Sequence, residues 1–406
     1  MTFGCSWPTS RDIWATGLEG PARQSPGGVN SRILIAGAGI GGLTLAALLH
    51  RRGRECLVLE RTARFAPVGA GLVLQPNAVK ALRIGGIEEE ILSHGSPMEK
   101  MEIRDDHGRV LSSVEAADFQ RRFGASIFGF HRATLHHALT TIIPETSIQL
   151  GAAVRAFGQT ADGVSVDLDS GERIEGAALV GADGLNSAVR RQTLADGEAR
   201  HSGYTSWRGV MPRGSLWPKG RMSESWGRGA RFGLVAIDGE RLYWFATANV
   251  AAGGRDSGKA ELLRRFSGWH APIREVIEAT PDEAILRTDI ADRNPVPVWG
   301  EGRVSLLGDA AHPMTPNLGQ GGCQAIEDAV VLELCLAHHA DEATALKDYE
   351  TRRLERTSRV VNEARRFGRF GQIENTFARA VRDLAVWMTP ASATLPTVRW
   401  LYDFDV

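Results

Sequence analysis

The sequence has few cysteines and no long apolar run. Its 406 residues include four cysteines, and none of them belongs to a C-x-x-C pair. Because so few thiols cannot build a disulfide framework or a zinc site, we expect free thiols in a reducing cytoplasm. The longest apolar stretches fall well short of the ~20 residues that span a bilayer, which argues against stable membrane insertion. The cysteines are Cys5, Cys56, Cys323 and Cys335.

An excess of charge of either sign is also missing. The formal net charge is -1, from 47 Lys and Arg residues against 48 Asp and Glu residues, and no long basic run occurs. Nucleic-acid binding needs a concentrated positive surface, so we expect no nucleic-acid partner. The histidine pairs 136–137 and 338–339 are adjacent in sequence and cannot share a helix face, so we expect no metal site. A G-x-S-x-G motif is absent as well, which argues against serine hydrolase chemistry.

A glycine-rich motif lies near the start of the chain. Residues 32–37 are aliphatic and predict a buried parallel strand, and residues 43–52 have an apolar helical pattern. Between them, Gly37, Gly39 and Gly42 form a G-x-G-x-x-G sequence in the context that dinucleotide binding requires. The first glycine permits a tight turn, the second lets the backbone approach a pyrophosphate, and the third allows close packing of helix on strand.

An acidic residue follows this motif at the expected distance. Residues 56–60 predict a second strand that ends at Glu60, about 20 residues after the glycines, where a carboxylate binds ribose hydroxyls. Arg61 either contacts the adenosine or lies in solvent. The motif predicts a dinucleotide ligand, and at this point both FAD and NAD(P) remain open.

Two later segments each place an aspartate after a buried strand. Asp183 follows the predicted strand 177–181, and Asp309 follows the predicted strand 302–308. Asp309 offers an acceptor for polyol hydroxyls. The segment after it contains Pro313 and Pro316, which stiffen the loop. Gly319, Gly321 and Gly322 then leave bare N–H donors at the start of a predicted helix over 323–337, where a flat ring with negative charge would be stabilised.

With these three segments in this order, residues 29–337 resemble the group A flavoprotein monooxygenases, the p-hydroxybenzoate hydroxylase-like family. The resemblance implies an α/β fold: a Rossmann-like FAD-binding domain with an inserted antiparallel β-sheet substrate domain and C-terminal helices. It implies non-covalent FAD, with NAD(P)H and O2 as co-substrates and oxygen transfer from a flavin C4a-hydroperoxide. It also implies that the segment of Asp183 takes part in binding both FAD and NAD(P)H, and that Asp309 binds the ribityl chain of FAD.

The resemblance extends to further cofactor positions. Arg132 matches a family arginine that packs on the ribose and adenine side of FAD, and an ordinary ion pair is the alternative. Val154 lies on a strand whose backbone, in family members, contacts the adenine. The complete set of expected FAD-binding residues is Gly37, Gly39, Ile40, Gly41, Gly42, Glu60, Arg61, Val73, Arg132, Val154, Asp183, Asp309, Pro316, Gly319, Gly321 and Gly322.

The expected domain layout interleaves two folding units. Residues 1–28 lack a periodic pattern and the apolar core of a signal peptide, so we expect a disordered extension. The FAD-binding domain comprises 29–97, 126–194 and 291–337. The substrate domain comprises 98–125 and 195–290, and C-terminal helices occupy 338–406. Strand-like segments at 203–210, 231–237 and 242–249, with a turn at 238–239, predict a mostly antiparallel sheet, and residues 261–269 predict a helix.

The expected substrate side lies on this sheet. Alternation places Arg231 on the face opposite Phe232, while Tyr243 and Phe245 share a face of the next strand. In the related FAD-dependent urate hydroxylases, nearest in pattern, an arginine and a tyrosine at matching positions hold an anionic purine. We therefore expect Arg231 and Tyr243 to flank one pocket and, with Pro316, to serve catalysis. Phe245 and Pro316 would also contact substrate. The loop sequence His-Pro-Met-Thr-Pro-Asn has the general family form, so urate itself stays open.

Three functions fit the sequence. The first is hydroxylation of a small aromatic or heteroaromatic ring. The second is epoxidation or tailoring of a larger hydrophobic molecule of the carotenoid or polyketide kind. The third is a flavin-binding protein without turnover. The choice between NADH and NADPH, and between a monomer and a homodimer, stays open.

Overall fold

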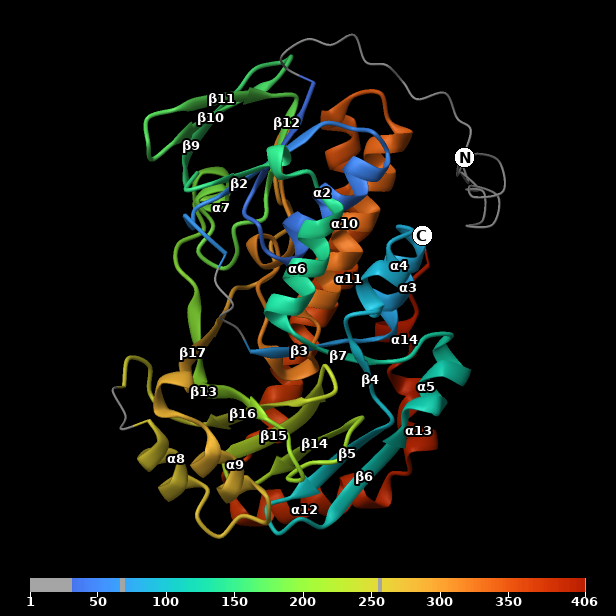
Figure 1. The fold of residues 1–406 in the computed structure, drawn as a ribbon, viewed down its shortest axis with the longest axis vertical. Helices are drawn as coiled ribbons and strands as arrows, with labels where there is room; N and C mark the ends of the chain where they lie inside the picture. Colours follow the sequence, from blue (N-terminus) through green and yellow to red (C-terminus); the bar gives the residue numbers. More distant parts are fainter. Residues whose placement is uncertain (1–30, 66–69, 255–257, 406) are drawn as a thin grey trace.

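A computed structural model describes residues 31–65, 70–254 and 258–405 of the chain. The extension expected at 1–28 lies outside the described residues. A Rossmann-like part occupies the upper half of Figure 1, and a large sheet with its helices occupies the lower half. The predicted α/β class is therefore confirmed.

The upper half is built on a five-stranded parallel sheet. Its strands lie in the order β18-β12-β1-β2-β8, and every neighbouring pair is parallel. The four strands predicted around the motifs are all present, and β8 completes the sheet. The strands are β1 (Ile33–Ala36), β2 (Cys56–Glu60), β8 (Ile148–Leu150), β12 (Ala178–Gly181) and β18 (Val304–Leu306).

Two apolar helices, α2 (Ile40–Arg51) and α10 (Gly321–His338), pack against each other beside this sheet. Each begins two or three residues earlier than its apolar pattern predicts. The reason is that the motif glycines lie inside the first turn of each helix instead of in the loop before it.

The lower half is a seven-stranded sheet in the order β17-β13-β16-β15-β14-β5-β6. It is antiparallel throughout except for the pair β14 and β5, which run parallel. The turn at Asp238 and Gly239 has φ values of +41° and +80°, as a tight hairpin requires. The strands are β5 (Lys100–Asp105), β6 (Val110–Glu115), β13 (Arg200–Pro212), β14 (Arg221–Trp226), β15 (Ala230–Ile237), β16 (Arg241–Ala248) and β17 (Leu286–Asp292).

The two faces of this sheet have different neighbours. Phe232, Leu234 and Ala236 form a buried cluster with residues of α8 (Lys259–Arg265) and α9 (Ile273–Ala279). Residues of the opposite face belong to a separate cluster, as the alternation predicts. The helix predicted over 261–269 was wrong at its end: α8 stops at Arg265, and the chain turns at Gly268, where φ is +81°.

Two smaller sheets and several short helices complete the fold. One three-stranded sheet contains β3 (Gly71–Leu74), β7 (Phe128–His131) and β4 (Ser96–Pro97). The other contains β9 (Val154–Gln159), β10 (Val164–Leu168) and β11 (Arg173–Gly176). The remaining short helices are α3 (Pro76–Ile84), α4 (Glu88–Leu92), α5 (Ala116–Phe123), α6 (Arg132–Ile142) and α7 (Ala188–Leu194).

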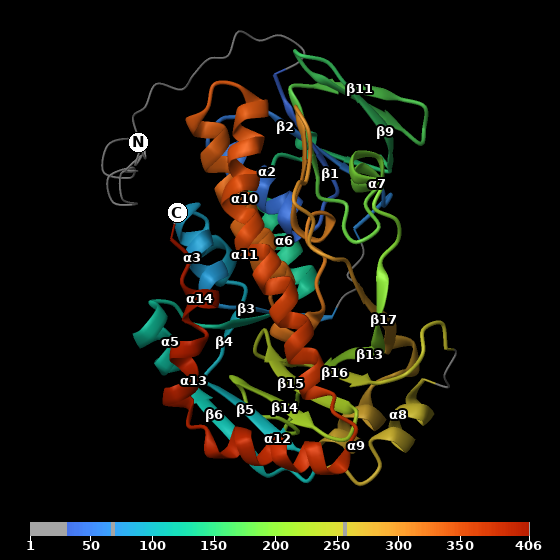
Figure 2. The same ribbon diagram turned by 180° about the vertical axis from the view of Figure 1, so that it is seen from behind.

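The C-terminal helices span both halves, as Figure 2 shows. Helix α11 (Glu342–Gly371) runs from the Rossmann part down to the seven-stranded sheet, and α12 (Thr376–Met388) lies along the lower edge. The chain then returns through α13 (Ala391–Thr397) and α14 (Arg399–Tyr402). The aromatic C-terminal end packs back onto the fold, because Phe404 is buried. Within the described residues, no helix is long and apolar enough to cross a membrane.

A buried ionic cluster joins α11 to α10. The Arg353 guanidinium lies 2.5 Å from Glu327 and 2.7 Å from Asp328. Asp328 also accepts a hydrogen bond from the backbone N–H of Gly308 at 2.9 Å and lies 2.6 Å from Nε2 of His312. Burial by itself would raise the pKa of the Asp328 carboxyl, but the charges of His312 and Arg353 outweigh burial and lower the pKa to about 2.

Replacing Arg353 tests how much this cluster contributes. Arg353→Met leaves buried carboxylates without their partner, which costs ~3–5 kcal/mol and should lower the melting temperature by at least about 5 °C. Arg366→Met is the matched control on the same helix, because Arg366 is exposed and forms a surface ion pair with Glu363. Circular dichroism melts of both variants measure the effect. Equal melting temperatures would show that the cluster is not a structural requirement.

Candidate active site

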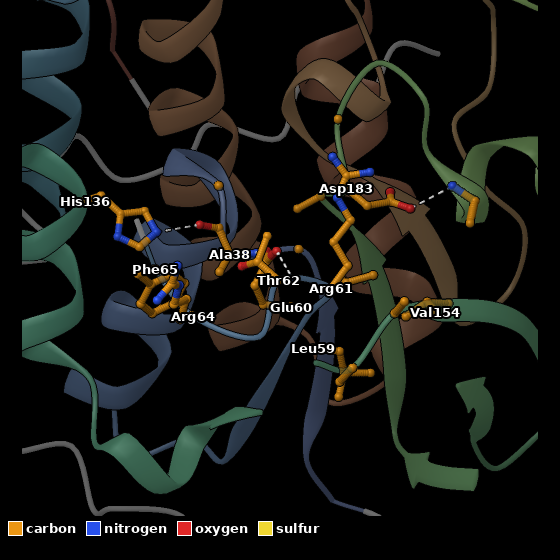
Figure 3. A pocket seen from close by; sticks show the side chains of 18 of the residues that line it. Ala38, Leu59, Glu60, Arg61, Thr62, Arg64, Phe65, His136, Val154 and Asp183 are labelled. Carbon is orange, nitrogen blue, oxygen red and sulfur yellow. Dashed lines mark hydrogen bonds between the residues drawn. The ribbon is translucent and has the colours of Figure 1, made fainter. Parts of the chain in front are cut away.

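The first motif opens onto a large cavity at the carboxyl end of the parallel sheet. Its volume is about 870 Å³, within the range of small-molecule sites. Figure 3 shows Glu60, Arg61 and Asp183 around it. The predicted cofactor residues that line it are Gly37, Gly39, Glu60, Arg61, Arg132, Val154 and Asp183.

The three glycines of the motif have the distinct roles that their spacing predicts. Gly37 has a φ of +103°, and a Cβ there would lie 2.6 Å from the carbonyl oxygen of Ala182. A Cβ on Gly42 would lie 2.1 Å from the carbonyl oxygen of Gly37, so this glycine lets α2 approach the strand. At Gly39 the nearest atom to an added Cβ is 3.9 Å away. Packing therefore explains the glycines at positions 37 and 42 but not the glycine at position 39. The absence of a side chain at Gly39 leaves its backbone open to the cavity.

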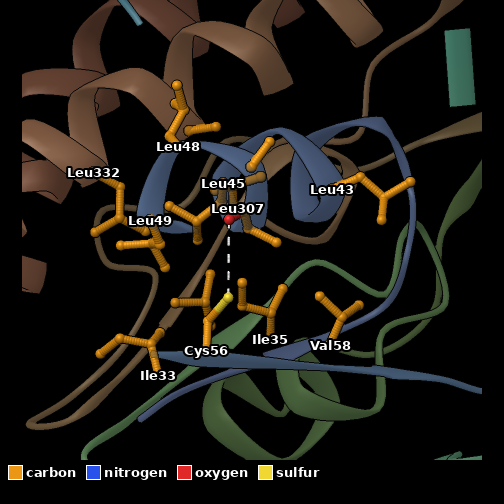
Figure 4. Close-up of a cluster of buried hydrophobic side chains, with 14 of the residues drawn as sticks. Ile33, Ile35, Leu43, Leu45, Leu48, Leu49, Cys56, Val58, Leu307 and Leu332 are labelled. Atoms are coloured by element: carbon orange, nitrogen blue, oxygen red, sulfur yellow. Dashed lines mark hydrogen bonds between the residues drawn. The ribbon is translucent and has the colours of Figure 1, made fainter. Parts of the chain in front are cut away.

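The close approach of α2 is fixed by the core beneath it. Figure 4 shows Leu45 and Leu49 of α2 on the side of the helix that faces Ile33 and Ile35 of β1. All of these side chains are almost completely buried. The helix N-terminus, with its unpaired N–H groups, is thereby held at the cavity.

Glu60 stabilises the motif as well as lining the cavity. One of its oxygens accepts a hydrogen bond from the N–H of Ala38 at 2.8 Å, and the other accepts from the N–H of Thr62 at 2.9 Å. The carboxylate is therefore positioned by two backbone donors. Its predicted contact with a ribose stays a prediction.

His136 is a cavity residue that sequence reasoning missed. Its Nε2 lies 3.0 Å from the carbonyl oxygen of Ala38, and its ring meets that of Phe65 edge-on at 4.4 Å. Burial lowers the pKa of this imidazole. The available signal was spacing: His136 lies four residues after Arg132 on one helix, so both residues share a face that points to the cavity.

The second motif leaves an unsatisfied buried acceptor at the cavity. Oδ2 of Asp183 accepts a hydrogen bond from the N–H of Ala188 at 2.7 Å, while Oδ1 is buried without a hydrogen-bond partner. Burial raises the pKa of this carboxyl. A buried acceptor without a donor is costly, so Asp183 is suited to a ligand hydroxyl. The bare Gly39 backbone, the helix terminus and Asp183 together fit the ADP half of FAD.

The third motif lies next to the first. Its loop contains two 3-10 turns, Gly308–Ala310 and Pro316–Leu318, and the second is followed by Gly319, with φ +63°. A Cβ on Gly322 would lie 3.6 Å from the Ile40 side chain, and a Cβ on Gly321 would lie 3.6 Å from Oδ1 of Asp309. Asp309 is exposed but closely surrounded by protein atoms, and this desolvation raises the pKa of its carboxyl.

Strand β3 borders this loop. The side chain of Gln75, just beyond β3, donates a hydrogen bond to the carbonyl oxygen of Leu318 at 2.8 Å, and Sγ of Cys323 lies 3.6 Å from the carbonyl oxygen of Val73. The predicted cofactor position Val73 therefore lies beside the glycine-rich start of α10.

The predicted substrate residues share one face of the large sheet. The register pairs Arg231 with Thr247, Gly233 with Phe245, and Val235 with Tyr243. Arg231 and Tyr243 are thus ~13 Å apart along the strands. A Cβ on Gly233 would lie 2.0 Å from the Phe245 ring, so that ring lies over the glycine between them. The structure does not bring Arg231 and Tyr243 into contact, and their common pocket stays a prediction.

Arg231 already has several polar partners. It is buried, and it lies 2.8 Å from Glu224, within 3.3 Å of Gln372 Oε1, and 2.5 Å from Asn317 Oδ1. Sequence reasoning missed these three partners because they come from a neighbouring strand, the loop of the third motif and the end of α11. The hydroxyl of Tyr204 also donates to Asn317, at 3.2 Å.

The rest of this face is largely apolar. Burial raises the pKa of Tyr243, which packs against Gly71 of β3. The apolar residues gathered on this face and its cover include Val73, Met98, Met101, Val114, Val210, Met222, Val235 and Phe245.

Comparison with known proteins agrees with this geometry. A family described as FAD binding domain matches residues 30–364. Aurachin C monooxygenase/isomerase of Stigmatella aurantiaca is 47% identical over 353 residues, covering 86% of this chain and 92% of that protein. FAD-dependent urate hydroxylase of Klebsiella pneumoniae is 35% identical, covering 82% and 89%. The structure of Klebsiella pneumoniae HpxO complexed with FAD and uric acid superposes with a TM-score of 0.85 at 30% identity, covering 90% and 95%.

The glycine geometry yields a paired test of cofactor binding. Gly39→Val should leave the melting temperature of the apoprotein nearly unchanged, because an added Cβ comes no closer than 3.9 Å to a protein atom. It should weaken FAD binding at least about tenfold, or ~1.4 kcal/mol, by filling the approach of the pyrophosphate. Fluorescence titration of apoprotein with FAD measures the affinity.

Gly42→Ala is the matched comparison. Its Cβ meets the carbonyl of Gly37, so this variant should lose stability by ~1–3 kcal/mol before any effect on the cofactor is considered. Wild-type FAD affinity in Gly39→Val would contradict the assignment of this cavity to FAD.

Proposed function

We propose that this chain, which belongs to the group A family of FAD-dependent flavoprotein monooxygenases, hydroxylates an aromatic or heteroaromatic ring that is held by apolar contacts and carries no carboxylate. The chain is an FAD-dependent oxidoreductase that consumes NAD(P)H and O2 and hydroxylates an aromatic substrate. A flavin-binding role without turnover is therefore set aside.

One observation carries the proposed substrate class: the Arg231 charge is already matched by Glu224 on an otherwise apolar face. A buried guanidinium paired with a carboxylate offers little net attraction to a second carboxylate. Binding a benzoate-like anion there would require Glu224 to move or to be neutralised. A ring with hydroxyl or oxo groups needs only apolar surface and a few hydrogen bonds.

The residues of the chain divide the work. Glu60 and Arg132 would hold the adenosine side of FAD, Asp309 its ribityl chain, and the N–H groups at the start of α10 its ring edge. When bound, FAD supplies hydride acceptance and the activation of O2. The apolar face would exclude water, which would limit the loss of activated oxygen as peroxide. Tyr243, whose raised pKa keeps its hydroxyl protonated, would orient the ring oxygen of the substrate by donating a hydrogen bond.

A location in the cytoplasm belongs to the same proposal. The three cysteines in the described part of the chain, Cys56, Cys323 and Cys335, are free and buried, which suits a reducing compartment.

The test is NAD(P)H oxidation by the FAD-loaded protein with a panel of ring compounds, with peroxide release measured in parallel. The panel contains aurachin C, urate, 6-hydroxynicotinate and 3-hydroxybenzoate, the compounds for which relatives are named. We expect coupled oxidation with aurachin C, since the relative named for it is 47% identical to this chain, and background rates with the two carboxylates. Efficient turnover of either carboxylate would overturn the proposed class.

Freeing the Arg231 charge should change this preference. Glu224→Gln keeps the shape of the side chain but removes the matching charge, so KM for 3-hydroxybenzoate should fall about tenfold relative to wild type. Glu102→Gln is the control, because Glu102 lies one strand away and faces the opposite side of the sheet. Steady-state kinetics with peroxide detection measure both. An unchanged KM in Glu224→Gln would show that Arg231 does not face the substrate.

A further inference from the structure

A second cavity, of about 520 Å³, lies on the other side of the third motif. It is formed where the start of β13 meets the loop at Thr315 and Asn317 and the C-terminal end of α11. It shares no lining residue with the cavity of the first motif. The lining includes Arg200, His201, Ser202, Arg365, Arg369 and Glu374.

The charges in this cavity favour an anion. Asp292 is buried and is matched by two guanidinium groups, since Arg200 lies 2.7 Å and Arg365 2.5 Å from it. Arg369 adds an exposed guanidinium that forms no hydrogen bond or ion pair within the described parts of the chain. Three arginines therefore face two acids, Asp292 and Glu374, and one of the arginines is unengaged.

The cavity also contains buried polar atoms without partners. Nε2 of His201 and Oγ of Ser202 are inaccessible to solvent and have no hydrogen-bond partner in the described structure. The other ring nitrogen of His201 accepts a hydrogen bond from the N–H of Gly203. Such groups are costly unless a ligand or water satisfies them, and they suit ribose hydroxyls or a carboxamide.

We propose that this cavity binds the nicotinamide nucleotide reductant, with Arg369 contacting a phosphate group and with His201 and Ser202 in the lining. The proposal rests on the monooxygenase activity stated above and adds the site at which its co-substrate docks, which differs from the contact with Asp183 that the family resemblance implies. The sequence contains no second G-x-G-x-x-G unit, so the nucleotide must use a cavity of another kind.

The position and the lining both distinguish this ligand from the aromatic substrate. Thr315 and Asn317 belong to the loop that would border the FAD ring, so a ligand in this cavity lies next to that loop. The lining is polar and cationic, whereas the sheet face proposed for the aromatic ring is apolar. A phosphate-bearing nucleotide matches the first environment, and a ring without a carboxylate matches the second.

The experiment compares Arg369→Ala with Arg366→Ala in the FAD-loaded protein. Both arginines are exposed on α11, but Arg366 is outside the cavity and pairs with Glu363. Calorimetric titration with NAD+ and with ADP-ribose gives binding constants without turnover. Anaerobic stopped-flow reduction by NADH and by NADPH gives the apparent Kd and the limiting reduction rate.

We expect Arg369→Ala to raise the Kd for NADH or NADPH and for ADP-ribose about tenfold, the effect of losing ~1.4 kcal/mol. Arg366→Ala should leave these constants unchanged, and neither variant should alter FAD affinity or the KM of the aromatic substrate. A raised aromatic KM with an unchanged nucleotide Kd would assign the cavity to the substrate and overturn the proposal. Unchanged constants throughout would also overturn it, while the ring-hydroxylase activity in the compound panel would stand independently.

Discussion

The buried carboxylate of Asp328 is the interaction on which the arrangement of the site depends. It accepts the backbone N–H of Gly308, pairs with His312 and receives the Arg353 guanidinium. These three partners belong to the loop of the third motif and to α11, while Asp328 itself lies on α10. A fully buried charge has to keep all its partners, because water cannot replace them. The loop that borders the expected flavin position is thereby fixed to the two longest helices of the fold.

Close packing imposes the second constraint. Gly42 allows α2 to touch the turn at Gly37, and Gly322 brings the start of α10 to the side chain of Ile40. The two helix N-termini therefore come together from opposite ends of the chain, where their N–H groups can face a negatively charged cofactor. Gly39, which has no side chain, and Asp183, which has an unpaired carboxylate oxygen, both line the cavity of the first motif.

The large sheet contributes to two different surfaces near the expected flavin position. Its inner face carries the compensated pair of Arg231 and Glu224 among apolar side chains. The start of β13, at the edge of the same half, carries the cationic cavity around Arg369. An aromatic substrate and a phosphate-bearing reductant have opposite solvation requirements, so separate surfaces let each ligand keep its preferred environment. Asn317 lies between them, because it contacts Arg231 and also lines the cationic cavity.

The sequence alone determined what depends on local spacing. The glycine pattern, the strand before it and the helix after it were predicted correctly, since a φ of +103° at Gly37 and the contact at Gly42 are properties of neighbouring residues. Alternation likewise assigned the two faces of β15, because side chains in a strand alternate whatever surrounds them.

The tertiary structure decided everything that joins distant segments. Arg231 could be read from the sequence as a free cation, yet its partners Glu224, Asn317 and Gln372 lie 7, 86 and 141 residues away. The parallel pairing of β5 with β14 and the inclusion of His136 in the cofactor cavity have the same origin. The physical reason is that the state of a charge depends on which groups surround it after packing, and no local pattern encodes that.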